Sequence, residues 1–192
     1  MNTIYKNLVE KWTQNQSFEE KIVTLFEKVR DIPYGNIGSR NPLDILEQNR
    51  GTCSGKHFLL KELYKAIDVP VRDFIVMHSF NDMDINFPPE IKEFLTSDQI
   101  IDPHNYIQIK PFNKWITIDA TWNLPLKKYN FPVNEFWNGK TSMPISVVVS
   151  TNIYETSEPE NLKKQLIEKL SIKQQKSRKL FLNLLTNWLL NI

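Results

Sequence analysis

Apolar residues recur at helical spacing in two stretches of the first half of the chain. Between residues 18 and 30 they fall at every third or fourth position. Ser17 and Glu20 precede and open this run as a capping box, in which a hydroxyl and a carboxylate satisfy free N–H groups of the first helical turn. A turn-forming segment around Pro33 ends the helix. A second amphipathic run extends over residues 53–67, and a shorter helix is expected over residues 3–14.

The middle of the chain changes to a strand-like pattern of alternating and β-branched residues. Strands are expected over residues 71–78, 101–110, 114–120 and 145–150. Residues 80–100 have no sustained period and contain two consecutive prolines, so we expect an irregular excursion over the surface. A second Ser-x-x-Glu pattern at residues 157–160 predicts another capping box, which opens a helical region reaching the end of the chain.

These elements indicate one α+β domain over residues 1–192, with a core at about 18–150 and a C-terminal helical extension at about 157–191. The chain is 41% hydrophobic, which suffices for a buried core, and its net charge of +2 gives no general attraction for nucleic acid. No apolar run reaches the roughly 18 residues of a membrane span. The polar N-terminal segment lacks the apolar stretch of a signal peptide, so a cytoplasmic location is expected.

The single cysteine, Cys53, excludes an intrachain disulfide, a CxxC redox pair and a multi-cysteine zinc site. It stands where the second helical run begins. A thiol there faces the free N–H groups of the first turn and the positive end of the helix dipole, and both favour the nucleophilic thiolate. Gly51 and Gly55 are expected to leave room for a substrate. The alternative is a buried structural cysteine, a common fate of a free thiol.

Two predicted strands bring a histidine and a carboxylate together. In an antiparallel hairpin with aligned aliphatic faces, Ile107 lies opposite Ile116, and the same register sets His104 opposite Asp119 on the other face. Cross-strand partners have Cβ atoms about 4.5–5.5 Å apart, within reach of an imidazole–carboxylate hydrogen bond. Such a bond leaves the other ring nitrogen free to take a proton from a thiol. Taken singly, His104 could be a partly buried strand residue and Asp119 the cap of a turn.

The order of these features resembles the transglutaminase-like superfamily, whose members have a papain-like core and a Cys–His–Asp triad. The resemblance covers residues 18–125 and departs from the family at Asp68, where a glycine is usual before the Val-Pro step. It is carried by seven segments: Asp31–Tyr34, Asn41–Leu46, Arg50–Cys53, Leu59–Leu60, Val69–Arg72, His104–Tyr106 and Lys114–Trp122.

The resemblance implies that Cys53 is the nucleophile, that His104 acts as base and then acid, and that Asp119 orients His104. It implies acyl transfer through a thioester, with a protein, peptide or small amide as substrate and no cofactor or metal. The Cys53 backbone N–H is the expected oxyanion donor, and Gln48 is a candidate second donor, one residue away from the papain-like spacing. Protease, amidase, deamidase and transglutaminase activities stay open. The alternative is a transglutaminase-like domain that serves as a non-catalytic protein-binding module.

The other histidines and the acidic residues allow further interpretations. His57 follows Cys53 by four positions, and we expect it to be a surface histidine, whereas His78 could face either way. A metal site formed by Cys53, His57 and His104 is conceivable, although no tight ligand spacing supports it. Residues 82–86 alternate acidic and polar side chains but lack the glycine and final glutamate of a calcium loop.

Two segments bear on partners and substrate. Residues 180–192 are strongly apolar and follow a basic stretch, so they could lie on a membrane, dock onto a partner, or pack on their own domain or a second copy as a homodimer. We favour packing on the domain or a homodimer. The substrate is not readable, because the pocket walls are expected from residues 80–100 and 123–144, which match no known pattern.

Overall fold

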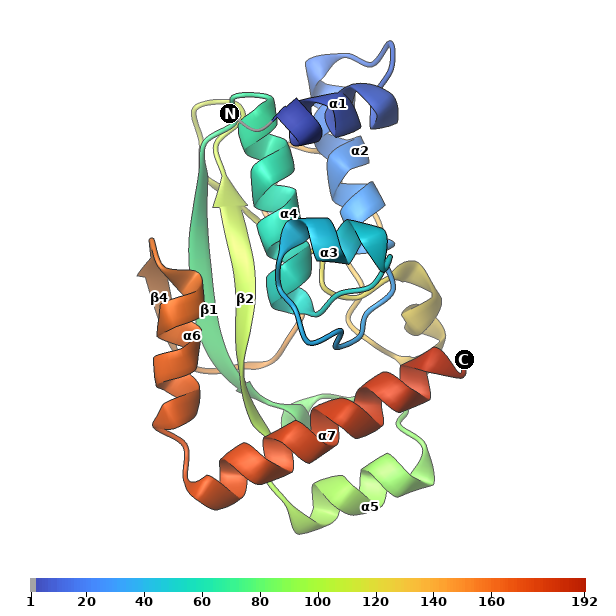
Figure 1. Ribbon diagram of the computed structural model, residues 1–192, viewed down its shortest axis with the longest axis vertical. Helices are drawn as coiled ribbons and strands as arrows, with labels where there is room; N and C mark the ends of the chain where they lie inside the picture. Colours follow the sequence, from blue (N-terminus) through green and yellow to red (C-terminus); the bar gives the residue numbers. More distant parts are fainter. Residues whose placement is uncertain (1–2) are drawn as a thin grey trace.

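A four-stranded antiparallel sheet in the order β3-β2-β1-β4 is surrounded by helices in the computed structural model, which describes residues 3–192 (Figure 1). The strands are β1 (Val71–Ser79), β2 (Ile101–Ile109), β3 (Ile116–Ile118) and β4 (Val149–Thr156). The helices are α1 (Thr3–Trp12), α2 (Phe18–Arg30), α3 (Pro42–Glu47), α4 (Cys53–Ala66), α5 (Pro89–Ser97), α6 (Pro159–Glu168) and α7 (Ile172–Leu190), with 3-10 turns at Phe80–Asp82 and Leu124–Tyr129. The expected α+β class, with the cysteine helix on an antiparallel sheet and further helices at both ends, is confirmed.

One hydrophobic cluster fixes α4 against the sheet. Ile107 and Ile109 of β2 and Ile116 and Ile118 of β3 share one buried face and pack with the apolar residues of α2 and α4. The predicted aliphatic face is therefore present. The capping box of Ser17 and Glu20 also forms as predicted and starts α2. Because α4 is anchored along its length, its first residue, Cys53, is held in a fixed place.

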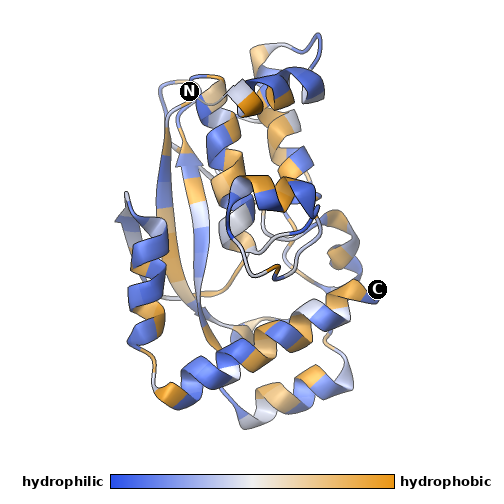
Figure 2. Ribbon diagram, in the orientation of Figure 1, coloured by the Kyte–Doolittle hydropathy of each residue, from blue (hydrophilic) through white to orange (hydrophobic). Residues whose placement is uncertain are grey.

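A second cluster forms on the opposite face, where Phe74, Val76 and Tyr106 of the sheet meet Phe181 and Leu185 of α7. Both of these α7 side chains are completely buried, so the C-terminal helix packs on its own chain, beside α5 (Figure 1). Figure 2 shows that α6 is mostly hydrophilic, in contrast to β1. Among residues 3–192, no helix is both long enough and apolar enough to span a bilayer.

The hairpin register differs from the prediction by two residues. Ile107 pairs with Ile118, and Ile109 pairs with Ile116. Continuing this register places Asp119 beside Tyr106 and diagonal to His104, instead of directly opposite it. A shift of two keeps every side chain on its predicted face, because strand side chains alternate with a period of two. Diagonal neighbours lie within reach of longer side chains, so the histidine and the carboxylate can still meet.

Three other element predictions are wrong. The segment 80–100 contains α5, which can form because Pro89 stands in its first turn, where proline is tolerated. The segment also buries Ile91 and Ile100, so it is not an excursion over the surface. The last strand, β4, is shifted toward the C-terminus of the expected 145–150 segment, since the residues that pair with β1 lie between Val149 and Thr156. The capping box predicted at residues 157–160 does not form: Pro159 opens α6 and leaves Glu158 as an N-cap without a side-chain bond.

Two local features explain family-like positions of the sequence. Asp68, which stands where the family usually has glycine, has a φ of 58°, a left-handed conformation that aspartate tolerates and glycine adopts freely. Gly55 has no room for a Cβ, which would lie 2.5 Å from Ile45 Cδ1 of α3. Gly51 is likewise covered by Ile45. The two glycines therefore allow α3 to approach α4, and the expectation that they leave space for a substrate is wrong.

Candidate active site

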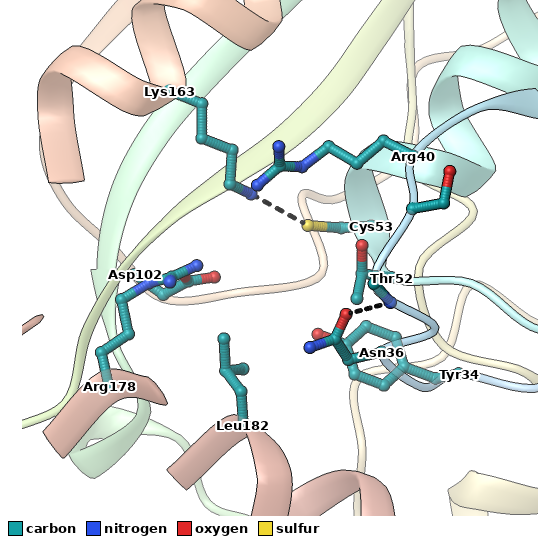
Figure 3. Close-up of a pocket in the computed structure, with 11 residues that line it drawn as sticks. Tyr34, Asn36, Arg40, Thr52, Cys53, Asp102, Lys163, Arg178 and Leu182 are labelled. Carbon is teal, nitrogen blue, oxygen red and sulfur yellow. Dashed lines mark hydrogen bonds and ion pairs between the residues drawn. The ribbon is translucent and has the colours of Figure 1, made fainter. Parts of the chain in front are cut away.

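Cys53 is the first residue of α4 and lies at the wall of a cavity of about 250 Å³ (Figure 3). Its N-cap, Thr52, makes no side-chain capping bond, so the first-turn N–H groups are not satisfied by that hydroxyl. Only 3% of Cys53 is exposed. The thiol is thus a buried group at the positive end of a 14-residue helix, in contact with a small cavity.

His104 and Asp119 form a buried hydrogen bond in which His104 Nε2 lies 2.7 Å from Asp119 Oδ2. The carboxylate also accepts the backbone N–H of Thr121 at 3.1 Å and that of Ser146 at 2.8 Å. Burial raises the pKa of Asp119, but the charge and hydrogen bond of His104 outweigh it and hold this pKa well below its usual range. Asp119 is therefore a fixed anion that sets the orientation of the imidazole.

The thiol and the imidazole form a charged pair. Burial lowers the pKa of His104, but the charge and hydrogen bond of Asp119, aided by Cys53, raise it to about 10. Burial raises the pKa of Cys53, but the Lys163 ammonium and then the hydrogen bond and charge of His104 lower it to about 6. Since Nε2 of His104 is bonded to Asp119, the other ring nitrogen is the one available to the thiol. At neutral pH, these values describe a thiolate beside an imidazolium.

Lys163 of α6 is a further residue of the candidate site, and the sequence did not indicate it. Its Nζ lies 3.6 Å from Cys53 Sγ, 2.9 Å from Ser54 Oγ and 3.1 Å from Asn105 Oδ1. The residue is only 4% exposed, so the ammonium is held in the protein next to the sulfur (Figure 3). A buried cation at this distance favours the thiolate strongly. Lys163 is far from Cys53 in sequence and belongs to no motif, so only the fold reveals it.

The cavity walls come from segments other than those expected. Asn36, Gly38, Ser39 and Arg40 of one loop line it, together with Asp102 of β2 and Arg178 and Leu182 of α7. Arg178 binds Asp102 through two nitrogens, each 2.5 Å from Oδ1. The segments 80–100 and 123–144 contribute no residue to this lining, so the expected walls are wrong. The C-terminal helices form the wall that the sequence did not predict.

His57 is completely buried, and its expected place on the surface is wrong. Its Nδ1 lies 2.7 Å from the Cys53 carbonyl oxygen, and its Nε2 accepts the Ala120 N–H at 2.9 Å. Because Nδ1 must donate to a carbonyl, the ring is the neutral Nδ1–H tautomer. Burial lowers the pKa of His57 to about 4, against the opposing charge of Asp119. His57 therefore connects the start of α4 to the end of β3 and has no free nitrogen for the thiol.

Of two other expected residues, Gln48 lies away from the thiol, whereas the ring of His78 packs edge-on against that of His104, with centroids 5.9 Å apart. Gln48 is exposed at the C-cap of α3 and is not part of the cavity lining, so the structure does not bring it to Cys53. His78 is buried, with Nε2 3.9 Å from Asp102 Oδ2, and burial lowers its pKa to about 3. Within residues 3–192, no group of three His, Cys, Asp or Glu side chains is arranged to hold a metal ion.

No family model matches the chain, and no curated protein matches it. Among solved structures, it is similar to "a Putative Cysteine Protease from Cytophaga hutchinsonii", with 18% identity and a TM-score of 0.44 over 81% of this chain and 48% of that one. It is also similar to a TGase, with 13% identity and a TM-score of 0.44 over 65% of this chain and 33% of that one.

The chain spans less than half the length of either neighbour. What the site can do chemically is therefore argued from its own geometry.

Proposed function

We propose that this protein is a thiol-dependent acyl-transfer enzyme that acts on amides through a thioester on Cys53. The observation that carries the proposal is the continuous arrangement of Asp119, His104 and Cys53, in which a 2.7 Å carboxylate–imidazole bond orients a histidine toward a thiol with a pKa of about 6. A protein-binding module has no need of this arrangement. The chemistry belongs to the class of nucleophilic catalysis by an activated cysteine.

In the first half of the reaction, the Cys53 thiolate attacks the carbonyl carbon of an amide and forms a carbon–sulfur bond. Negative charge moves to the carbonyl oxygen, where the Cys53 backbone N–H at the helix start donates a hydrogen bond. The Lys163 ammonium, 3.6 Å from Sγ, adds positive charge near the sulfur to which the substrate carbon binds. The imidazolium of His104 then protonates the leaving nitrogen, the carbon–nitrogen bond breaks, and an amine and a thioester result.

In the second half, neutral His104 takes a proton from water or from an acceptor amine, which attacks the thioester. Release of the acyl group restores the thiolate and the imidazolium. Attack by water gives hydrolysis or deamidation, and attack by an amine gives transamidation. Asp119 holds the ring in place through both halves, since its carboxylate is fixed by the N–H groups of Thr121 and Ser146.

The test uses p-nitrophenyl acetate, an activated acyl donor that reports p-nitrophenolate by its colour. We expect a burst of one equivalent, with the acetyl group located on Cys53 by mass spectrometry. Adding a primary amine then separates the two outcomes: faster loss of the adduct with formation of the amide indicates transamidation, and an unchanged rate indicates hydrolysis. Cys53→Ala is the control and should give no burst. A folded wild-type protein that never acquires an acetyl group on Cys53 contradicts the proposal.

A further inference from the structure

Positive charge exceeds negative charge around the cavity at Cys53. Three cationic side chains, Arg40, Lys163 and Arg178, line it, and Asp102 is the one carboxylate among the lining residues. Asp102 is already bound by Arg178. The thiolate of Cys53 compensates Lys163, which lies 3.6 Å away. Arg40 is the cation for which this lining provides no counter-charge.

Arg40 is exposed in a loop, and its side chain has no ion pair or hydrogen bond within residues 3–192. Its side chain extends toward the part of the cavity into which Lys163 also points (Figure 3). Arg40 also borders a separate groove that includes Glu160 and Glu168, yet it pairs with neither of these within the described chain. Two cations directed into one small cavity repel each other unless an anion lies between them.

The chemistry of the proposed reaction increases this imbalance. When Cys53 becomes a thioester, its negative charge disappears, and the lining then holds three cations and one carboxylate. The helix dipole of α4 adds positive potential at the same place. An anionic group on the acyl part of the substrate would restore the balance. Arginine is well suited to this role, because its planar guanidinium binds a carboxylate through two parallel hydrogen bonds.

We infer that the acyl donor carries a carboxylate close to its reactive carbonyl and that Arg40 binds this carboxylate. The inference rests on the proposed function, which it narrows to a substrate class. The cavity volume of about 250 Å³ is slightly below the usual range for small-molecule sites, so it fits a small amide or the end of a peptide. Neutral amides of the same size should be poorer substrates.

The test compares two alkylating reagents of nearly the same size but different charge. Iodoacetate carries a carboxylate next to its reactive carbon, whereas iodoacetamide is neutral. We measure both rates at Cys53 by mass spectrometry at low ionic strength and take their ratio, with glutathione as the reference for a free thiolate. The ratio of iodoacetate to iodoacetamide should exceed that of glutathione at least about threefold, because a nearby cation attracts the anionic reagent.

The variants assign this preference to Arg40. Arg40→Gln should lower the ratio toward that of glutathione, and Arg40→Lys should retain part of it. Lys164→Gln is the matched control, because Lys164 is a cation of the same helix as Lys163 but is absent from the cavity lining, so its ratio should be unchanged. Alkylation without a preference for iodoacetate, or a preference that survives in Arg40→Gln, overturns the inference alone. A thiol that neither reagent modifies faster than a free cysteine near pH 7 overturns the proposed function and the inference together.

Discussion

The charge of a single sulfur atom decides what the site can do, and three side chains from different elements determine that charge. Burial alone would keep Cys53 protonated, but Lys163 and His104 together outweigh it. Asp119 acts on the sulfur only through His104. The site is thus a chain of charges in which each member depends on its neighbour, and removing one member should change the titration of the next.

The first prediction concerns the pH dependence of this pair. Alkylation of Cys53 should rise through about pH 6, where the thiolate forms, and acyl transfer should fall again near pH 10, where His104 loses its proton. His104→Ala should move the acid limb of alkylation to higher pH. Asp119→Ala should act in the same direction but less strongly. The double variant His104→Ala/Asp119→Ala should have nearly the same alkylation profile as His104→Ala alone, because the two residues act as one unit.

His57→Gln is the control for the first prediction. Since both ring nitrogens of His57 contact backbone groups, its loss should lower the stability of the fold and leave the acid limb near pH 6. The pH profile of iodoacetamide alkylation, measured for each folded variant, checks all of these expectations. A limb that moves in His57→Gln but stays in place in His104→Ala would exclude His104 as the partner of the thiol.

The second prediction concerns Lys163. Lys163→Met keeps most of the length of the side chain and removes its charge, so the pKa of Cys53 should rise by about 1–3, as expected for loss of an opposite charge within about 4–6 Å. Alkylation at pH 7 should slow accordingly. Lys164→Met, one position along α6 and largely exposed, should leave the profile unchanged. Equal profiles for the two variants would show that the ammonium of Lys163 does not act on the sulfur.

Local sequence patterns identified only the residues that belong to motifs. Cys53, His104 and Asp119 were recognisable because each lies in a short segment with a family-like pattern. Lys163 lies 110 positions from Cys53 and looks like any other lysine of an amphipathic helix. His57 has the spacing of a surface residue on α4, and only the close approach of Ala120 shows why it is buried. Contacts between distant segments have no local signal.

At the scale of elements, the hairpin shows why a wrong register still gave the right pair. The aliphatic pattern of β2 and β3 determines which face each residue occupies, and this was predicted correctly. The register itself depends on the turn and on where β3 ends, at Ile118, and alternation alone does not distinguish shifts of two residues. Asp119 reaches His104 because it follows β3 directly and its carboxylate is turned by the N–H groups of Thr121 and Ser146.

The third prediction concerns the connection of α2, α4 and the end of β3 through Lys56. This lysine is completely buried, and its Nζ donates to the carbonyl oxygens of Arg30 and Thr121 at 2.8 and 2.7 Å. Burial lowers its pKa to about 7, despite the opposing charges of Asp31 and Asp119. Between pH 7 and the ordinary value of 10.5, the unfolded chain therefore binds more protons at this position than the folded protein. The contribution of Lys56 to stability should rise with pH in that window and reach its minimum below pH 7.

Lys56→Met isolates this contribution, because methionine fills the same space without titrating. The free energy of unfolding of the wild type, measured with urea, should increase relative to that of Lys56→Met by up to about 1.4 kcal/mol per pH unit between pH 7 and 10. Lys65→Met, with a half-exposed side chain at the other end of α4, is the matched control and should show no such trend. A constant difference across this range would mean that Lys56 does not change its charge on folding.

At the scale of the whole molecule, the site is assembled from both ends of the chain. Cys53 and the loop around Arg40 come from the first third, His104 comes from β2, and Asp119 directly follows β3. Lys163, Arg178 and Leu182 come from the two C-terminal helices. The apolar residues 180–192 were recognised in the sequence as a packing surface. The surface on which they pack was not predicted, because the hydrophobic pattern of a helix does not specify its partner. The fold places it where its polar residues reach the cavity.

The last prediction follows from this double role of α7. Deletion of residues 172–192 uncovers the cluster to which Phe181, Leu185 and Leu189 belong, and it removes Arg178 from the buried carboxylate of Asp102. Loss of the apolar contacts and an unpaired buried charge are each strongly destabilising. We therefore expect the shortened chain to aggregate or to lose its cooperative thermal transition, measured by circular dichroism and light scattering. Removing only residues 191–192, which follow the helix and are exposed, should leave the transition intact. A soluble, monomeric and cooperatively folding core after the longer deletion would show that α7 is not required for the fold, and Cys53 alkylation in that core would then show whether the charged wall is required for the site.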